Sequence, residues 1–297
     1  MNIRRLAAGS TLALLGLMSP GLSQAQTEQQ APPARVSNVT NDNRLFMRFI
    51  EDAAIVPSYR AEAQFWFFSN MPSMQEPFGL DDIGNNPPSR VQRDAEKAGD
   101  ADIFELRPMF ALNVAEDLEF GARFGLAKRD PSEGSGDSGL TDLDLWGKIS
   151  LVSDPIKISA GLVLSLPTGD GDTLLGTGET NVEFFGAARK DFTHLTVAAN
   201  VGVRINQDQD FGSNEAEGKN SILFGAAVLV PAGSKTVLTA EWAFETERLE
   251  GLKNYSTLMG GAEYRYREDI LARAAIGGGL SDGSPDFLLT CSVAWLF

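Results

Sequence analysis

The chain has 297 residues and carries 25 Lys and Arg against 40 Asp and Glu, which gives a formal net charge of −15 at pH 7. This acidic balance argues against a nucleic-acid partner, because phosphate backbones are bound mainly through Lys and Arg. The single cysteine, Cys291, excludes an intrachain disulfide, and we interpret it as a small apolar residue.

The first 25 residues, 1–25, have the three parts of a secretory signal peptide. Arg4 and Arg5 precede a short apolar stretch at 12–18, and small residues precede a cleavage point after Ala25. A buried N-terminal helix is the alternative interpretation of this apolar stretch. Removal of the segment leaves 23 Lys and Arg against 40 Asp and Glu, a net charge of −17. The pattern predicts export from the cytoplasm.

Residues 26–58 differ in composition from the rest of the chain. Residues 26–34 are polar and contain two prolines, which is typical of a flexible leader. The Asn-Asp-Asn run at 41–43 then precedes apolar residues with the spacing of one helix face, so it predicts a short helix behind an Asx cap. These apolar residues are Leu45, Phe46, Phe49, Ile50 and Ala53.

Over residues 59–297, apolar side chains recur at every second position in about twelve segments of roughly ten residues, the length of a tilted membrane-spanning strand. In 117–127, the clearest of them, apolar residues such as Leu118 alternate with charged residues such as Glu119. The longest apolar run, 222–230, is far shorter than the roughly 20 residues of a spanning helix. The segments are 59–69, 103–113, 117–127, 140–152, 156–166, 180–190, 194–205, 220–230, 235–247, 257–267, 270–280 and 286–297, of which 59–69 and 220–230 alternate poorly.

Short connections alternate with long ones along this part of the chain. The short ones are 114–116, 153–155, 191–193, 231–234 and 268–269, and the long ones are 70–102, 128–139, 167–179, 206–219, 248–256 and 281–285. Bacterial outer-membrane barrels have short periplasmic turns, long external loops and an even number of strands. The sequence therefore predicts an all-β fold: a closed antiparallel transmembrane β-barrel of about 12 strands with short periplasmic turns and long extracellular loops.

A secreted all-β sandwich or barrel is the alternative, because its strands also alternate. A water-soluble barrel of about twelve strands would enclose a lumen too wide for side chains to fill. Charge on the opposite face of successive strands instead suits a wet lumen. If the chain forms a membrane barrel, residues 26–58 are either a periplasmic leader against the barrel rim or a small plug in the periplasmic mouth.

The alternation continues to the final residue, with Trp295 and Phe297 on the apolar face. Termini of soluble proteins usually fray into water. An apolar strand at the end of the chain therefore predicts a closing strand with lipid on its outer face, in the outer membrane of a Gram-negative bacterium. The expected partners are outer-membrane lipid and, through this C-terminal strand, the outer-membrane assembly machinery.

If the apolar faces meet lipid, the charged residues on the opposite faces line the lumen. There they either filter solutes or pair across the barrel and fill it. The candidates are Glu105, Arg107, Glu119, Arg123, Asp142, Asp144, Lys148, Glu183, Arg189, Arg204, Glu241, Glu245, Glu263, Arg265, Arg267 and Arg273.

The sequence contains motifs that resemble those of soluble enzymes, but they lack the neighbouring elements that such motifs require. We therefore predict no catalytic residue, no metal site and no cofactor. The glycine-rich run 134–139 has dinucleotide-binding spacing, but an alternating strand follows it instead of a helix. The only histidine, His194, is predicted to face the lumen near the periplasmic end, away from any nucleophile. Acidic loop residues such as 208–210 are predicted to be solvated, with calcium binding as the alternative.

The stretch 164–170, Leu-Ser-Leu-Pro-Thr-Gly-Asp, followed by the Gly-Thr-Gly run at 176–178, resembles the outer-membrane barrel family of meta-pathway phenol-degradation-like transporters. Residues 55–59, together with Glu62, resemble the start of that family's first strand. The resemblance covers 55–297 and implies passage of small aromatic or apolar molecules across the outer membrane. Proline ends ladder hydrogen bonding and glycine permits a folded-in loop, so this loop either narrows the pore or lies exposed. The constriction-loop candidates are Pro167, Thr168, Gly169, Asp170, Gly176 and Gly178.

The sequence thus predicts a signal peptide at 1–25, a leader or plug at 26–58 and a barrel at 59–297. The predicted function is a passive channel or transporter for small solutes, without enzymatic activity. The alternatives are a structural or surface-interaction barrel with a closed lumen and, less favoured, an outer-membrane lipid hydrolase.

Overall fold

The computed structural model describes residues 39–72, 100–132, 136–169, 175–211 and 214–297, which belong to one compact unit beginning at Val36. The predicted signal peptide, residues 26–38 and Asp170 lie outside the described residues. Among the described residues, no helix is long and apolar enough to cross a membrane.

All regular structure in the described residues is β-strand. The strands are β1 (Tyr59–Met71), β2 (Ala101–Ala115), β3 (Leu118–Arg123), β4 (Leu126–Pro131), β5 (Asp137–Leu140), β6 (Leu143–Val152), β7 (Lys157–Leu166), β8 (Asn181–Asp191), β9 (Thr196–Ile205), β10 (Gln209–Phe211), β11 (Asn214–Ala216), β12 (Ser221–Pro231), β13 (Thr236–Glu245), β14 (Tyr255–Arg267), β15 (Ile270–Gly279) and β16 (Phe287–Leu296).

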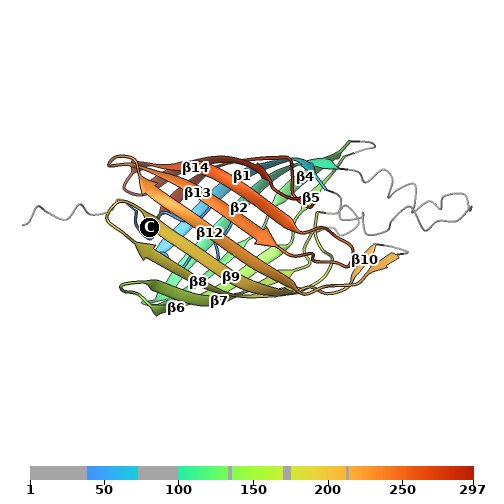
Figure 1. Ribbon diagram of the computed structural model, residues 1–297, viewed down its shortest axis with the longest axis horizontal. Helices are drawn as coiled ribbons and strands as arrows, with labels where there is room; N and C mark the ends of the chain where they lie inside the picture. The colour runs from blue at the N-terminus through green and yellow to red at the C-terminus, as the bar shows by residue number, and fades with distance from the viewer. Residues whose placement is uncertain (1–38, 73–99, 133–135, 170–174, 212–213) are drawn as a thin grey trace, which may run out of the picture. The chain divides into compact units, whose positions relative to one another are not determined.

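Fourteen of these strands form one antiparallel sheet that closes on itself, because β1 pairs with both β16 and β2 (Figure 1). β3 and β4 lie end to end along β2, and β5 and β6 pair with them in the same way. β3 and β4 therefore make one interrupted strand, β5 and β6 make a second one, and the barrel has 12 strands. This confirms the predicted fold class.

The two kinds of connection lie at opposite ends of the barrel. The short turns lie at one end, where the C-terminus is also found, and the long connections with β10 lie at the other (Figure 1). We call these the turn end and the loop end. The predicted loop 128–139 is wrong in part, because much of it is strand: β4 extends along residues 101–106 of β2, and β5 pairs with β4. β4 forms there because the long strand β2 offers it backbone hydrogen-bonding partners.

The poor alternation of 220–230 has a physical explanation in the fold. In β12, residues such as Ile222 and Phe224 are exposed on the outside, but the inward residues Leu223, Ala227 and Leu229 are also apolar. These inward residues are buried. Two of them, Ala227 and Leu229, belong to an apolar cluster that includes Val39 and Leu45. The strand is apolar on both faces because the chain before β1 covers its inner face.

Residues 39–58 form turns and bends, so the predicted short helix is wrong. Asn43 accepts a hydrogen bond from the Thr40 amide at 2.9 Å, which caps a turn and not a helix. The backbone groups of this segment bond to barrel side chains, so they do not need the bonds of a helix. The Glu241 carboxylate accepts from the amides of Phe46 (2.7 Å) and Arg48 (2.8 Å). We call residues 39–58 the inner segment.

Candidate functional site

The inner segment is packed against the inner face of the barrel. Its apolar side chains are buried in three clusters with inward-facing strand residues. Phe49 and Ile50 are in a cluster with Trp146 and Phe185, whereas Phe46 is in a cluster with Trp66. The side chains predicted for one helix face are therefore buried, but they contact several strands instead of one surface.

Glu119 of β3 is the central carboxylate of this contact. It accepts hydrogen bonds from Arg44 Nη2 at 2.7 Å, from the Val56 amide at 2.8 Å and from Trp146 Nε1 at 3.1 Å. Lys148 Nζ lies 3.2 Å from the same carboxylate, and both side chains of this pair are fully buried. One barrel residue thus binds both ends of the inner segment.

Two barrel cations bind the middle of the inner segment. Lys148 donates to the carbonyl oxygens of Asp52 (2.9 Å) and Ala54 (2.8 Å). Arg189 pairs with the Asp52 carboxylate at 3.1 Å and donates to the Asn43 carbonyl at 2.9 Å. Burial by itself raises the pKa of the Asp52 carboxyl, but the charges of Arg189, Arg44 and Lys148 hold that pKa below its ordinary value.

A second buried network lies on the other side of the inner segment. Glu62 of β1 pairs with Arg60 at 2.6 Å and with Arg273 at 2.8 Å, and Arg273 lies 3.1 Å from Glu263. Arg273 also donates to the carbonyl oxygen of Arg44. The two carboxylates and two guanidinium groups of this network, all on barrel strands, therefore balance, and all four side chains are buried.

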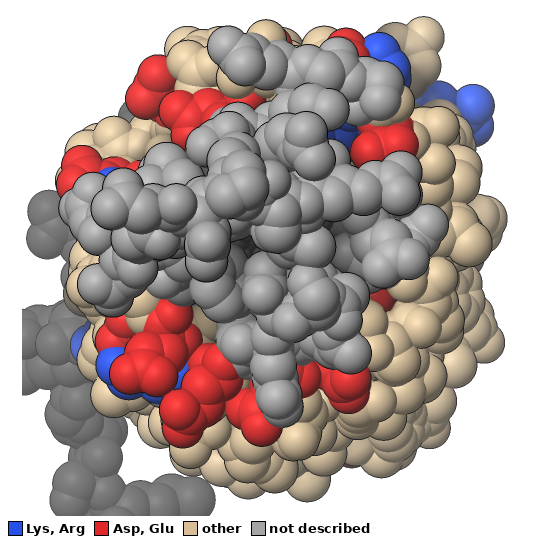
Figure 2. All heavy atoms as spheres, turned by 90° about the vertical axis from the view of Figure 1, so that its right-hand side faces the viewer, with Lys and Arg blue, Asp and Glu red and all other residues tan. Residues whose placement is uncertain are grey.

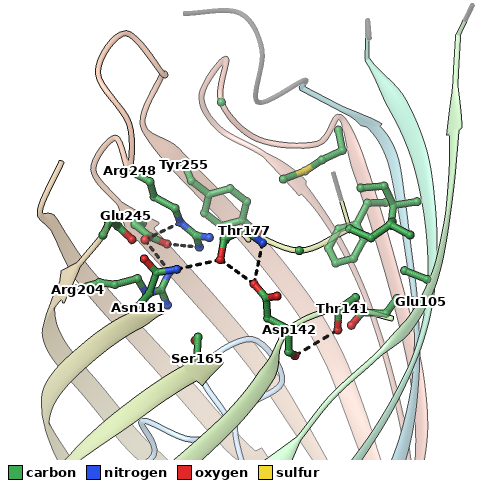
Figure 3. A pocket seen from close by; sticks show the side chains of 18 of the residues that line it. Glu105, Thr141, Asp142, Ser165, Thr177, Asn181, Arg204, Glu245, Arg248 and Tyr255 are labelled. Carbon is green, nitrogen blue, oxygen red and sulfur yellow. Dashed lines mark hydrogen bonds and ion pairs between the residues drawn. The ribbon is translucent and has the colours of Figure 1, made fainter. Parts of the chain in front are cut away.

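A cavity of about 450 Å³ lies on the loop side of the inner segment. Figure 3 shows Glu245, Arg204 and Arg248 on one wall, Glu105 opposite them, and Thr177 between. Seven of the predicted lumen residues line this cavity. They are Glu105, Arg107, Arg123, Asp142, Asp144, Arg204 and Glu245.

The charged residues around the cavity are paired. Arg107 pairs with Glu105 at 2.5 Å, and Arg123 pairs with Asp144 at 2.6 Å. Arg204 bridges Glu183 (2.6 Å) and Glu245 (2.8 Å), and Arg248 pairs with Glu245 at 2.7 Å. The cavity therefore has a wall of ion pairs that is partly exposed to its interior.

The loop between β7 and β8 is fastened to the cavity wall by Asp142. Its carboxylate accepts from the Gly169 amide at 3.1 Å and from the Thr177 amide and hydroxyl, both at 2.8 Å. Gly169 and Gly176 approach so closely that a Cβ on Gly176 would lie 2.7 Å from the Gly169 Cα. Leu175, Gly176 and Thr177 line the cavity, so this part of the loop narrows it.

The other described constriction-loop candidates do not reach the cavity. Pro167 and Thr168 are exposed, and Gly178 is exposed with a φ of +71°, in the left-handed region that favours glycine. The interruption between β3 and β4 also depends on a glycine. A Cβ on Gly125 would lie 2.2 Å from Glu105 Oε1, so this carboxylate occupies the space that any larger residue would need.

The remaining lumen candidates divide between the inner segment and the turn end. Glu119, Lys148, Arg189, Glu241 and Arg273 bind the inner segment, and Glu263 is buried beside Arg273. Arg265 reaches Asp42 at 3.0 Å. Arg267 does not line the lumen: its side chain is 65% exposed and pairs with Asp269 in the turn before β15. A register shift between Arg265 and Arg267, at the end of β14, interrupts the alternation, so it no longer fixes the side-chain direction.

His194, Trp295 and Phe297 lie away from the lumen. His194 is exposed in the short turn before β9, so its predicted inward orientation is wrong, because the strand begins only at Thr196. Trp295 is 41% exposed and Phe297 is 71% exposed. Phe297 also exchanges two backbone hydrogen bonds with Tyr59, the first residue of β1.

Sequence reasoning missed the charged residues of the inner segment and the start of β1. Arg44, Arg48, Glu51 and Asp52 have no strand period that would assign them a face. The alternation of Arg60, Glu62 and Gln64 in β1 was a usable signal, since all three are buried in the interior. Arg248 and Tyr255 lie beyond the predicted strand ends and also line the cavity.

Comparisons with known proteins agree on the fold. No protein-family model matches the chain, and no curated protein matches it by sequence. Its structure resembles that of an outer-membrane channel from Pseudomonas putida F1, with a TM-score of 0.61 and 16% identity over 83% of this chain and 98% of that chain. It also resembles the NanC porin, with a TM-score of 0.52 and 9% identity over 80% of this chain and all of that chain (100%). The chain therefore has the barrel fold of outer-membrane channels.

Proposed function

We propose that the protein is an outer-membrane channel for the passive passage of small solutes. The observation that carries this proposal is a cavity of about 450 Å³ with ion pairs in its wall, inside a barrel whose outward residues are apolar. Apolar outward strands suit a bilayer, and a polar interior suits a solute path. In this proposal the turn end faces the periplasm, the loop end faces the exterior, and residues 1–25 direct export.

We further propose that the inner segment restricts the periplasmic half of the path. Its polar contacts run to many strands, among them β3 through Glu119, β6 through Lys148, β8 through Arg189, β13 through Glu241 and β15 through Arg273. Because these contacts fill the interior with buried side chains, passage through that half requires the segment to shift. We also propose that the outward face of β16 contacts lipid and the assembly machinery, because Trp295 and Phe297 are apolar and exposed there.

Deletion of residues 27–52 tests the role of the inner segment. The variant keeps the predicted cleavage point and removes Arg44 and Asp52, so we expect a larger single-channel conductance in planar bilayers. Unchanged conductance would contradict the proposed restriction. Swelling of liposomes in small sugars and aromatic acids tests the channel function itself, and an absence of flux in both the intact and the deleted protein would contradict it.

A structural barrel with a closed lumen is the second candidate function. The fully buried pairs Arg44–Glu119 and Arg273–Glu62 favour it, because they hold the interior together instead of leaving it open. Liposome swelling separates the two functions: a structural barrel passes no solute even when residues 27–52 are absent.

A further inference from the structure

We propose that the cavity at the loop end binds small organic monocarboxylates that carry an apolar body. This inference rests on the proposed channel function and names a class of solute for it. It is drawn from the arrangement of the guanidinium groups, from their exposure and from the apolar residues that share the cavity with them.

Three arginines present the same kind of unused donor to the cavity. Arg107, Arg123 and Arg248 each use Nε and Nη2 to bind one carboxylate, at distances between 2.5 and 3.0 Å. Nη1 of each forms no hydrogen bond with the described residues, and each of these residues lines the cavity. A guanidinium has five N–H donors, so each of these groups keeps two for a further acceptor.

The carboxylates lie behind the guanidinium groups in two of these pairs. The side chain of Arg107 is 22% exposed against 8% for Glu105, and that of Arg248 is 43% exposed against 5% for Glu245. In the third pair, Arg123 and Asp144, the exposures are nearly equal. The cavity therefore offers more N–H donors than free carboxylate oxygens, although the charges in its wall are balanced.

The same cavity has an apolar side. Phe68, Ile103 and Phe124 contribute to its lining, together with Leu175 and Leu252 from the loops. A volume of about 450 Å³ lies within the range of roughly 300–1,000 Å³ of small-molecule sites. A ligand that fits both parts has one acceptor head and a compact apolar body.

A carboxylate is the head that these donors select. Hydrogen bonds from Arg to a charged acceptor are about twice as strong as those between neutral groups. An ammonium head would have to compete with the arginines for carboxylates that are already bonded. A neutral solute would gain burial of its apolar body but would leave the arginines with weaker acceptors.

Acidic side chains lie at several places around the edge of the loop end, and they act against an incoming anion (Figure 2). Exposed Asp137, Asp208, Glu217, Glu250 and Asp282 lie in the hairpins and loops of this end. Their effect on a distant solute is screened within about 8 Å at physiological ionic strength. The rim thus slows the approach of an anion at low salt, whereas the donors inside the cavity set which head is bound.

Calorimetric titration of the mature protein in detergent tests the proposal with three probes of similar size. The probes are sodium benzoate, benzyl alcohol and benzylammonium chloride, each at physiological ionic strength. We expect benzoate to bind at least about 10-fold more tightly than either of the others, the factor that corresponds to one charge-assisted hydrogen bond. In R248Q, we expect benzoate affinity to fall about 10-fold while that of benzyl alcohol stays the same.

R267Q is the matched control, because it removes the same charge from an exposed position at the end of β14, outside the cavity. Equal binding of benzoate and benzyl alcohol, or unchanged benzoate binding in R248Q, overturns the proposal. If R248Q does not fold, R107Q is measured instead and is read in the same way. Flux of sugars without benzoate binding contradicts only the carboxylate site, whereas benzoate binding without any solute flux contradicts only the channel function.

Discussion

At the scale of single residues, Glu119 satisfies several groups that would otherwise be buried without a partner. It neutralises Arg44 and Lys148 and accepts from the Val56 amide and the Trp146 indole. Removal of one partner from a buried ion pair costs about 3–5 kcal/mol, because the remaining charge is left uncompensated. The attachment of the inner segment should therefore be sensitive to this one carboxylate.

We expect Glu119→Gln to raise the single-channel conductance, because an amide of the same size leaves Arg44 and Lys148 without the carboxylate that contacts them directly. Recording in planar bilayers measures the change. Glu116→Gln is the matched control, since it makes the same substitution three residues earlier at an exposed position. Equal conductance of the two variants would show that Glu119 does not hold the inner segment.

Asp52 gives the attachment a defined pH dependence. The pKa of Asp52 is lowered from 3.8 in the folded protein, despite burial, by Arg189, Arg44 and Lys148. A carboxyl with a depressed native pKa contributes stability that is fully present above its unfolded pKa and is lost as the pH falls through the native value. We expect the contribution of Asp52 to be constant from pH 8 to about pH 5, and its loss to raise the conductance only below about pH 4.

Asp52→Asn separates this carboxyl from the others in the interior. The variant lacks the ionisable group, so the part of the acid-induced rise that belongs to Asp52 should disappear. A rise of the same size in Asp52→Asn and in the unsubstituted protein would assign the pH dependence to other carboxyls.

The direction of most interior side chains followed from the sequence, but their partners did not. A period of two places Glu119, Arg123, Asp144 and Lys148 on inward faces. Which of them pair depends on the register of β3 against β6, which sets Arg123 opposite Asp144 and Glu119 opposite Lys148. Alternation within one strand contains no information about that register.

At the scale of elements, the inner segment shows why a helical spacing failed. Residues 44–54 have an apolar spacing that fits a helix, but a helix would use its own amides and carbonyls internally. Here Glu241, Lys148 and Arg273 bond to those backbone groups from the barrel wall. The side chains that decide the conformation are far away in the sequence, so local pattern reasoning could not include them.

The loop between β7 and β8 is held by one side chain, and its removal should free the loop. We expect Asp142→Ala to add current fluctuations to single-channel recordings, because Gly169 and Thr177 lose three hydrogen bonds to this carboxylate. Such bonds to a charged group contribute about 1.5–3 kcal/mol each. Asp269→Ala, at an exposed position in the turn after β14, is the control. Equal current fluctuations in both variants would show that Asp142 does not hold the loop between β7 and β8.

At the scale of the whole molecule, the twelve strands and their order of short and long connections were predictable from alternation and spacing. The two poorly alternating segments, β1 and β12, pack apolar inward residues such as Trp66 and Leu229 on the inner segment. Apolar and polar residues alternate weakly in these two strands because the inner segment covers apolar residues on their inward faces. The pattern within a single strand cannot show such a contact.

Because the sheet is closed, we expect the barrel to stay folded in detergent. Its strands pair from β1 around to β16, and β1 also pairs with β2, so the sheet closes on itself. Among the described residues, only the short strand β5 at the loop end has an edge of the barrel sheet without a strand partner. We expect the purified protein to need detergent in solution and to run faster on SDS gels before heating than after. Dispersal without detergent and identical mobility before and after heating would contradict a membrane barrel.

The seam between β1 and β16, which runs from Arg60–Leu296 to Ser69–Phe287, joins the earliest and the latest strands that the ribosome makes. Until this seam forms, the sheet is an open ribbon whose first and last strands each lack a partner on one side. The inner segment, which precedes β1, is enclosed on every side only when the seam closes. We therefore expect the pairing of β1 with β16 to be the step of assembly that buries ion pairs such as Arg44–Glu119.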